Sequence, residues 1–122
     1  MEKVLVTGGA GYVGSVLVPM LLEKGYDVTV FDNLMYGGDG ILPLFHNDNF
    51  HFVKGDVRDG NAFKKAISNA DSIVHLAAIV GYPACKKDPV LAKQINEDSS
   101  KFIADNISPE QLVVFTSTGS NY

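Results

Sequence analysis

The sequence lacks several features that mark secreted, membrane-bound and nucleic-acid-binding proteins. Its single cysteine, Cys85, excludes an internal disulfide and fits a reducing compartment. The longest apolar run falls far short of the ~18 residues that a membrane span requires, and the first residues, MEKVLVTGG, do not resemble a signal peptide. With 10 basic and 14 acidic residues, the chain has a net charge of −4 and no basic cluster. These absences predict a cytoplasmic protein with no membrane or nucleic-acid partner.

Short apolar segments alternate with segments of helical periodicity along the 122 residues. The pattern predicts strands over residues 4–6, 28–31, 50–53, 72–76 and 111–116, helices over 12–24, 57–69 and 88–106, and one helical turn near 41–45. Continuously apolar strands separated by helices are typical of a parallel sheet covered on both faces. With right-handed crossovers, this predicts an α/β fold: a doubly wound parallel (Rossmann) sheet of five strands in the order 3-2-1-4-5.

Glycines are concentrated where the first predicted strand meets the first predicted helix. Gly8, Gly11 and Gly14 recur there at three-residue spacing. Such a turn needs unusual φ angles, and a phosphate that approaches the helix N-terminus needs a neighbour without a side chain. The free backbone N–H groups and the helix dipole favour an anion at this point. The spacing therefore predicts a dinucleotide site, and the alternative is a tight turn with no ligand.

The second predicted strand ends at Asp32. A carboxylate there can accept two hydrogen bonds from the ribose hydroxyls of adenosine, and it would repel a 2′-phosphate. The position favours NAD over NADP as cofactor, so an NADPH-dependent reductase is a weaker alternative. An aspartate that only closes a turn is the other interpretation.

The stretch from Thr7 to Gly14, TGGAGYVG, resembles the nucleotide-binding signature of the extended short-chain dehydrogenase/reductases. Further segments match that family in the same order along the whole chain: FDNL at 31–34, GDVRD at 55–59, HLAA at 75–78, INE at 95–97 and TST at 116–118. The resemblance implies that the cofactor-binding residues are Gly8, Gly11, Tyr12, Val13, Gly14, Asp32, Asn33, Leu34, Asp56, Val57, Leu76, Ala77, Ala78, Val80, Asn96, Thr116 and Ser117.

The resemblance also implies roles for single residues. Asp56 would accept a hydrogen bond from the exocyclic amine of adenine, and Val57 would pack on the ring. Thr118 would supply the hydroxyl of the catalytic triad, with Ser117 beside it. His75 ends the fourth predicted strand and is expected to be structural rather than catalytic. No histidine shows metal-ligand spacing, so no metal site is expected.

One family motif does not occur in its expected place. The catalytic Tyr-x-x-x-Lys of the family follows the hydroxyl residue, and the sequence ends at Tyr122. Tyr82 and Lys86 fit the letters, but they precede the fifth predicted strand. We therefore expect residues 1–122 to be an incomplete NAD-binding Rossmann domain that lacks the family's later strands and its C-terminal substrate-binding part. Without the phenol at the reacting hydroxyl, hydride transfer would be slower by roughly 10²–10⁴.

Within the family, the closest likeness is to nucleotide-sugar epimerases, dehydratases and 4-dehydrogenases. This implies a nucleotide-sugar substrate in the complete enzyme and oxidation of a sugar hydroxyl by hydride transfer to NAD. A second hypothesis is a non-catalytic dinucleotide-binding or redox-sensing module.

The fifth predicted strand, 111–116, is apolar on both faces and would have a bare outer edge. We expect the isolated chain either to form a homo-oligomer through this edge or to be a piece of a longer protein.

Overall fold

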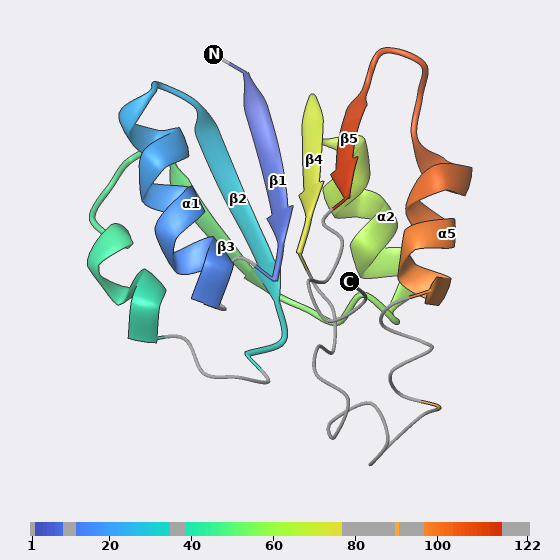
Figure 1. Cartoon of the computed structure of the whole chain (residues 1–122). Coiled ribbons are helices and arrows are strands. Elements are labelled where there is room, and N and C mark those ends of the chain that lie inside the picture. The colour runs from blue at the N-terminus through green and yellow to red at the C-terminus, as the bar shows by residue number, and fades with distance from the viewer. Residues whose placement is uncertain (1, 9–11, 35–38, 77–89, 91–96, 116–122) are drawn as a thin grey trace, which may run out of the picture.

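Five parallel strands form one sheet in a computed structural model, which describes residues 2–8, 12–34, 39–76, 90 and 97–115. The strands are β1 (Lys3–Thr7), β2 (Asp27–Asp32), β3 (Phe50–Lys54), β4 (Ser72–His75) and β5 (Leu112–Phe115). Their order is β3-β2-β1-β4-β5, and every neighbouring pair is parallel (Figure 1). The predicted fold class and strand order are therefore confirmed.

Helices cover both faces of the sheet. The elements are α1 (Tyr12–Glu23), the 3₁₀ helix η1 (Asp39–Leu44), α2 (Gly60–Ser68) and α5 (Ser99–Asn106). Side chains of α1 and η1 pack with Val4 and Val6 of β1, whereas side chains of α2 and α5 pack with Leu5 on the other face. The crossovers thus change face between β3 and β4. The carboxyl ends of β1 and β4 consequently form the topological switch point, where open α/β sheets bind their ligands.

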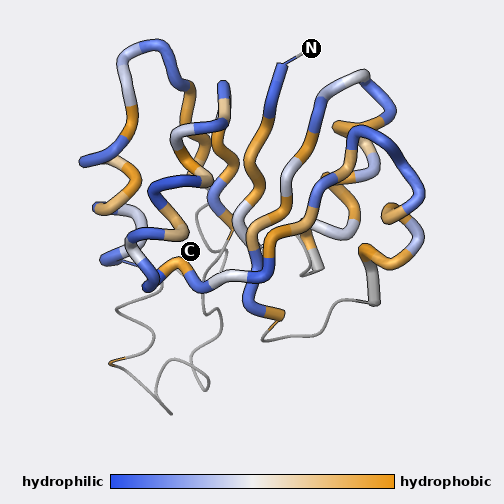
Figure 2. Tube along the Cα trace, turned by 180° about the vertical axis from the view of Figure 1, so that it is seen from behind, coloured by the Kyte–Doolittle hydropathy of each residue, from blue (hydrophilic) through white to orange (hydrophobic). Residues whose placement is uncertain are grey.

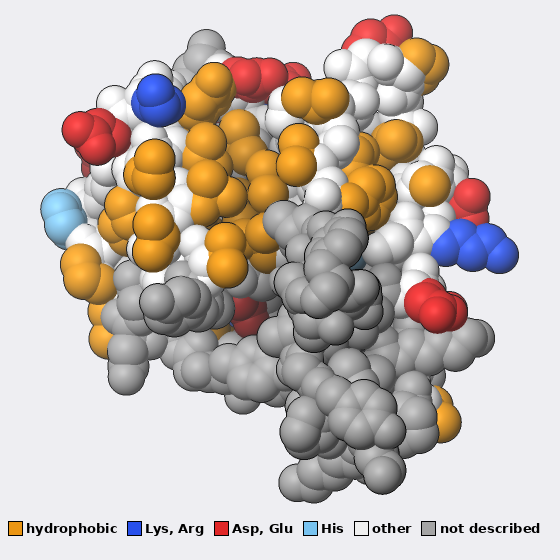
Figure 3. Space-filling view, in the orientation of Figure 1, with side chains coloured by type: hydrophobic (Ala, Val, Ile, Leu, Met, Phe, Trp, Pro, Cys, Tyr) orange, Lys and Arg blue, Asp and Glu red, His pale blue; other side chains and the backbone are white. Residues whose placement is uncertain are grey.

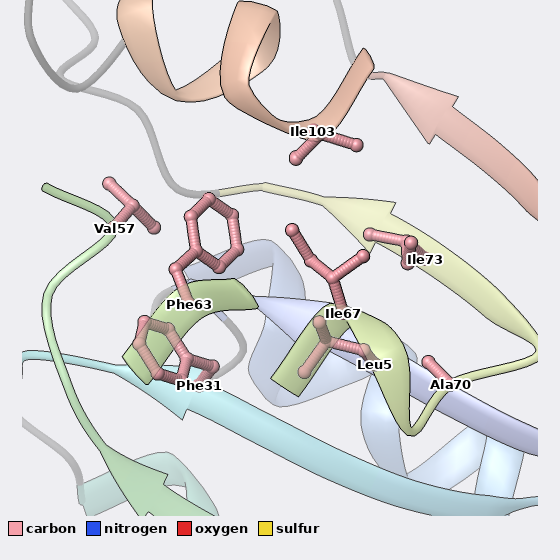
Figure 4. Close-up of a cluster of buried hydrophobic side chains, with 8 residues drawn as sticks. All are labelled: Leu5, Phe31, Val57, Phe63, Ile67, Ala70, Ile73 and Ile103. Carbon is pink, nitrogen blue, oxygen red and sulfur yellow. The ribbon is translucent and has the colours of Figure 1, made fainter. Parts of the chain in front are cut away.

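Aromatic rings fill the core between the sheet and α2 with α5. The cluster consists of Leu5, Phe31, Val57, Phe63, Ile67, Ala70, Ile73 and Ile103 (Figure 4). Phe63 is central, because its ring stacks on Phe31 at a centroid distance of 5.4 Å and on Phe102 at 5.5 Å. Phe63, Ile67 and Ile103 are all fully buried.

The α1 helix has the predicted span but packs through another stripe. The apolar residues whose spacing predicted it include Val13, Val16 and Met20, and all three are more than half exposed. The buried stripe contains Val18 and Leu22, four residues apart and therefore on one side of the helix. Because α1 is apolar nearly all round, the periodicity alone did not distinguish the two stripes. The helix ends before Gly25, whose φ of 94° lies in the left-handed region that favours glycine.

One helix start differs from the expected one. The second predicted helix began at residue 57, but α2 begins at Gly60 because Asp59 is its N-cap, with a side-chain oxygen that accepts from the N–H of Ala62 at 3.4 Å. The preceding residues form a turn in which the N–H of Asp59 donates to the carbonyl of Asp56 at 2.9 Å. Of the helix expected over 88–106, the structure describes α5, and residues 88, 89 and 91–96 lie outside the described residues.

A glycine after β3 allows an unusually close approach of the chain to the core. A Cβ at Gly55 would lie 2.5 Å from Cζ of Phe31, which no side chain tolerates. The N–H of Gly55 donates to the carbonyl of Asp32 at 3.0 Å, so the ends of β2 and β3 stay together.

Figure 2 shows the hydropathy of the chain from behind, with apolar positions largely in the strands and hydrophilic positions largely at the turns. In the part of the chain that the structure describes, no helix is long and apolar enough to cross a bilayer.

Candidate functional site

The predicted glycine turn lies at the carboxyl end of β1. Gly8 has a φ of 71°, and its N–H donates to the carbonyl of Phe31 at 2.9 Å. On the other side, the N–H of Leu76 donates to the carbonyl of Thr7 at 2.9 Å. Gly8 therefore lies between the ends of β2 and β4. Residues 9–11, including the predicted Gly11, lie outside the described residues.

The N-terminus of α1 opens onto this same edge. The helix begins at Tyr12, and its first turn contains no acidic residue. The N–H groups of a first turn have no partner within their own helix, and the helix dipole adds a partial positive charge there. Gly14 is buried, as a glycine packed against the sheet should be. The combination is suited to an anion such as a phosphate.

Asp32 ends β2 beside the glycine turn, and its carboxylate is held by the next residues. The N–H of Leu34 donates to Oδ1 of Asp32 at 2.7 Å. Leu34 has a φ of 61°, which is rare for a residue with a branched side chain. Such backbone strain is found mainly at binding and active sites. The strained turn orients the carboxylate that the sequence predicts as the ribose acceptor.

Asp56 follows Gly55 and carries an arrangement that the sequence did not predict. Arg58 grips its carboxylate, with Nε 2.9 Å from Oδ1 and Nη2 2.5 Å from Oδ2. The backbone N–H of Arg58 also donates to Oδ1 at 2.9 Å. The hydrogen bond from the Arg58 side chain lowers the pKa of Asp56, a shift that burial opposes and the side chain of Asn33 supports. Asp56 is therefore an ionised, acceptor-only group at neutral pH.

Val57 is the residue between Asp56 and Arg58 in the sequence. Its side chain is 9% exposed and belongs to the core cluster of Phe31 and Phe63. Most of the surface that a ring could contact is therefore already covered. Its packing against adenine stays a prediction.

His75 connects three elements at the switch point. Its Nδ1 lies 2.6 Å from Oγ1 of Thr7 at the end of β1, and its Nε2 lies 2.9 Å from Oγ of Ser99 at the start of α5. Burial lowers the pKa of His75 to about 4, so the ring is neutral at pH 7. Because both ring nitrogens have partners inside the protein, the geometry agrees with the structural role expected for His75. Ser99 was not predicted, because its only sequence signal is a polar residue within an amphipathic helix.

The remaining predicted residues differ in how they are placed. Val13 is exposed in the first turn of α1, and Leu76 is partly buried against the core on the α1 face. Ala77, Ala78, Val80, Asn96, Thr116, Ser117 and Thr118 lie outside the described residues, as does the side chain of Tyr12. Among the described residues, no group of His, Cys, Asp or Glu is arranged to hold a metal ion.

The described site residues are thus placed in a fixed sequence along one edge of the sheet. The helix terminus that suits an anion lies after β1, the oriented Asp32 lies after β2, and the ionised Asp56 lies after β3. This order suits an extended ligand whose phosphate lies at the N-terminus of α1 and whose hydrogen-bond donors face Asp32 and Asp56.

Known proteins share this arrangement of sequence and fold. The profile of the NAD dependent epimerase/dehydratase family matches residues 4–122. The UDP-glucose 4-epimerase of Neisseria meningitidis serogroup B is 30% identical over 129 aligned positions, which cover 100% of this chain and 38% of that protein.

Two solved structures show the same likeness. Pal from Bacillus thuringiensis superposes with a TM-score of 0.88 and 27% identity, over 95% of this chain and 39% of that one. The Thermus thermophilus UDP-glucose 4-epimerase in complex with NAD superposes with a TM-score of 0.74 and 32% identity, over 85% of this chain and 33% of that one. The chain therefore spans less than half the length of the relatives that it matches.

Proposed function

The chain belongs to the NAD-dependent epimerase/dehydratase family, and from this premise we propose that residues 1–122 form the NAD-binding portion of an enzyme that acts on a nucleotide sugar. The observation that carries the proposal is Asp32, which is oriented by the N–H of Leu34 on the same edge as the N-terminus of α1. A dinucleotide needs these two groups together, one for its pyrophosphate and one for its ribose.

Each described group then has one task. The first turn of α1 binds the pyrophosphate, and Gly8 and Gly14 let it approach the backbone. Asp32 accepts hydrogen bonds from the ribose hydroxyls, and Asp56 accepts one from the amino group of adenine. When bound, NAD supplies the acceptor for the hydride of a sugar carbon.

The substrate part of the proposal rests on the relatives and on the motif at 116–118. The matching proteins include a UDP-glucose 4-epimerase over the full span of this chain, which favours a nucleotide sugar. Thr118 would hydrogen-bond the reacting hydroxyl of that sugar. The proton acceptor of the reaction would come from a Tyr-x-x-x-Lys pair that residues 1–122 do not contain in the expected place.

A non-catalytic dinucleotide-binding or redox-sensing module is the second candidate, because Asp32 and the N-terminus of α1 serve dinucleotide binding and need no catalytic group. We also propose that this chain self-associates through β5, whose side chains Leu112 and Val114 are exposed. A cytoplasmic location without a nucleic-acid partner stays a prediction of the sequence.

Calorimetric titration of residues 1–122 with NAD and with NADP tests the cofactor site. We expect NAD to bind more tightly, and we expect Asp32→Asn to weaken NAD binding about tenfold or more, because hydrogen bonds to a charged group contribute about 1.5–3 kcal/mol. Asp105→Asn is the matched control, since it removes an exposed carboxylate from α5. Tighter binding of NADP than of NAD would contradict the assignment of Asp32.

The same preparation, assayed with several nucleotide sugars, separates the two candidates. Binding of NAD without turnover is the expected result for residues 1–122. Turnover by this chain would contradict the role given to the missing tyrosine.

A further inference from the structure

The carboxylate of Asp56 has no remaining capacity for another hydrogen bond. Arg58 supplies three donors to it, namely its backbone N–H, Nε and Nη2, and the side chain of Asn33 supplies another. A carboxylate offers about four lone-pair sites. An amino group that arrives at Asp56 must therefore replace one of the donors already present.

The guanidinium of Arg58 is the donor group most easily replaced. The Arg58 side chain is 41% exposed, and exposed ion pairs contribute little net stability. The backbone N–H of Arg58 is fixed, because it belongs to the turn that precedes α2. This turn does not need the guanidinium, since the N–H of Asp59 closes it on the carbonyl of Asp56 and Asp59 caps the helix.

On the basis of the proposed function, we propose that Arg58 competes with the base of the dinucleotide for Asp56 and so limits the selectivity of the site for adenine. Asp56 as a carboxylate only accepts hydrogen bonds, so it favours a base with an amino group at this position. Arg58 only donates, so it favours a base with a carbonyl there. The two neighbours therefore prefer opposite bases, and removing Arg58 leaves the preference of Asp56 alone.

The test compares NAD with nicotinamide hypoxanthine dinucleotide, which has a carbonyl in place of the adenine amino group. The quantity measured is the ratio of the two dissociation constants, by calorimetric titration of residues 1–122. We expect Arg58→Ala to raise the preference for NAD about two- to fivefold, the range that the loss of an exposed ion pair allows. The ratio excludes general charge effects, because both ligands carry the same pyrophosphate.

Two further variants sharpen the test. Lys64→Ala removes an exposed positive charge from α2 and is expected to leave the ratio unchanged. Asp56→Asn offers both a donor and an acceptor, so it is expected to reduce the preference for NAD to nearly none. Thermal unfolding of Arg58→Ala is expected to match that of the unsubstituted chain, because the turn keeps its backbone hydrogen bonds.

Three results would overturn the inference. A ratio that stays constant or falls in Arg58→Ala would show that Arg58 does not compete for Asp56. A ratio that is unchanged in Asp56→Asn would show that Asp56 does not bind the base, while the proposed cofactor site would stand. Failure of both dinucleotides to bind the unsubstituted chain would overturn the proposed function and this inference together.

Discussion

Val6 and Val114 occupy the same row across the sheet but have very different surroundings. The row runs through paired positions from Val30 to Val6, Val74 and Val114 on the α1 face. Val6 is 0% exposed under α1, whereas Val114 is 45% exposed on β5. The two valines thus differ in exposure, because the helices on this face cover only part of the sheet.

On the opposite face of the sheet, the helices cover the strands as far as β5. There the row from Leu5 to Ile73 and Val113 packs under α2 and α5. Figure 3 shows the α1 face, on which apolar side chains lie at the surface. The face on which each crossover helix packs, rather than the hydrophobicity of a strand, therefore decides which residues become core.

The largest expected loss of stability comes from a substitution at the centre of the core under α2 and α5. Phe63→Ala removes the ring that stacks on both Phe31 and Phe102, and we expect it to lower the free energy of unfolding by about 3–5 kcal/mol. Leu112→Ala, on the uncovered part of the sheet, should change it by less than about 0.5 kcal/mol. Urea denaturation measures both. Equal losses would contradict the difference between the two faces.

A smaller effect concerns the neutral His75 within the covered face. Because burial depresses the pKa of His75 from 6.5 to about 4, the unfolded chain binds more protons between these values. The stabilisation is complete above pH 6.5 and is lost as the pH falls toward 4, a loss of about 3 kcal/mol. We expect denaturation curves of His75→Asn to lack this part of the pH dependence.

The control for this experiment is His46→Asn, because His46 is exposed in the segment between η1 and β3. That variant should keep the slope of the unsubstituted chain between pH 6.5 and 4. An unchanged slope in His75→Asn would show that His75 is not held neutral by the fold.

The smallest effect on stability is expected on the uncovered face, where association should change instead. Val114→Lys places a charge on the exposed row of β5, and charged edge strands resist pairing with other chains. Light scattering should show less self-association, with a change in unfolding free energy within about 0.5 kcal/mol. Val53→Lys on the other edge strand, β3, is the matched control. A monomeric unsubstituted chain would contradict the proposed association through β5.

The strands and their order were predictable because buried parallel strands are continuously apolar and because crossovers have one hand. The left-handed glycine after the first strand, Gly8, followed from an equally local rule. The packing stripe of α1 was not predictable, since Val13 and Val16 are as apolar as Val18. Only tertiary contacts distinguish them.

The candidate site was predictable where a single residue carries the signal, as Asp32 does at the end of β2. The site was not predictable where the role of a residue depends on its hydrogen-bond partner. The grip of Arg58 on Asp56 depends on the turn before α2, and the partner of His75, Ser99, lies on a helix distant in sequence. Both require the three-dimensional arrangement.

Gly55 and Phe31 illustrate a constraint of another kind. The aromatic ring occupies the volume that any side chain at position 55 would need. These two positions therefore cannot vary independently. In a redesign of this domain, a larger residue at 55 becomes admissible only together with a smaller one at 31, and the stacking with Phe63 is then lost as well.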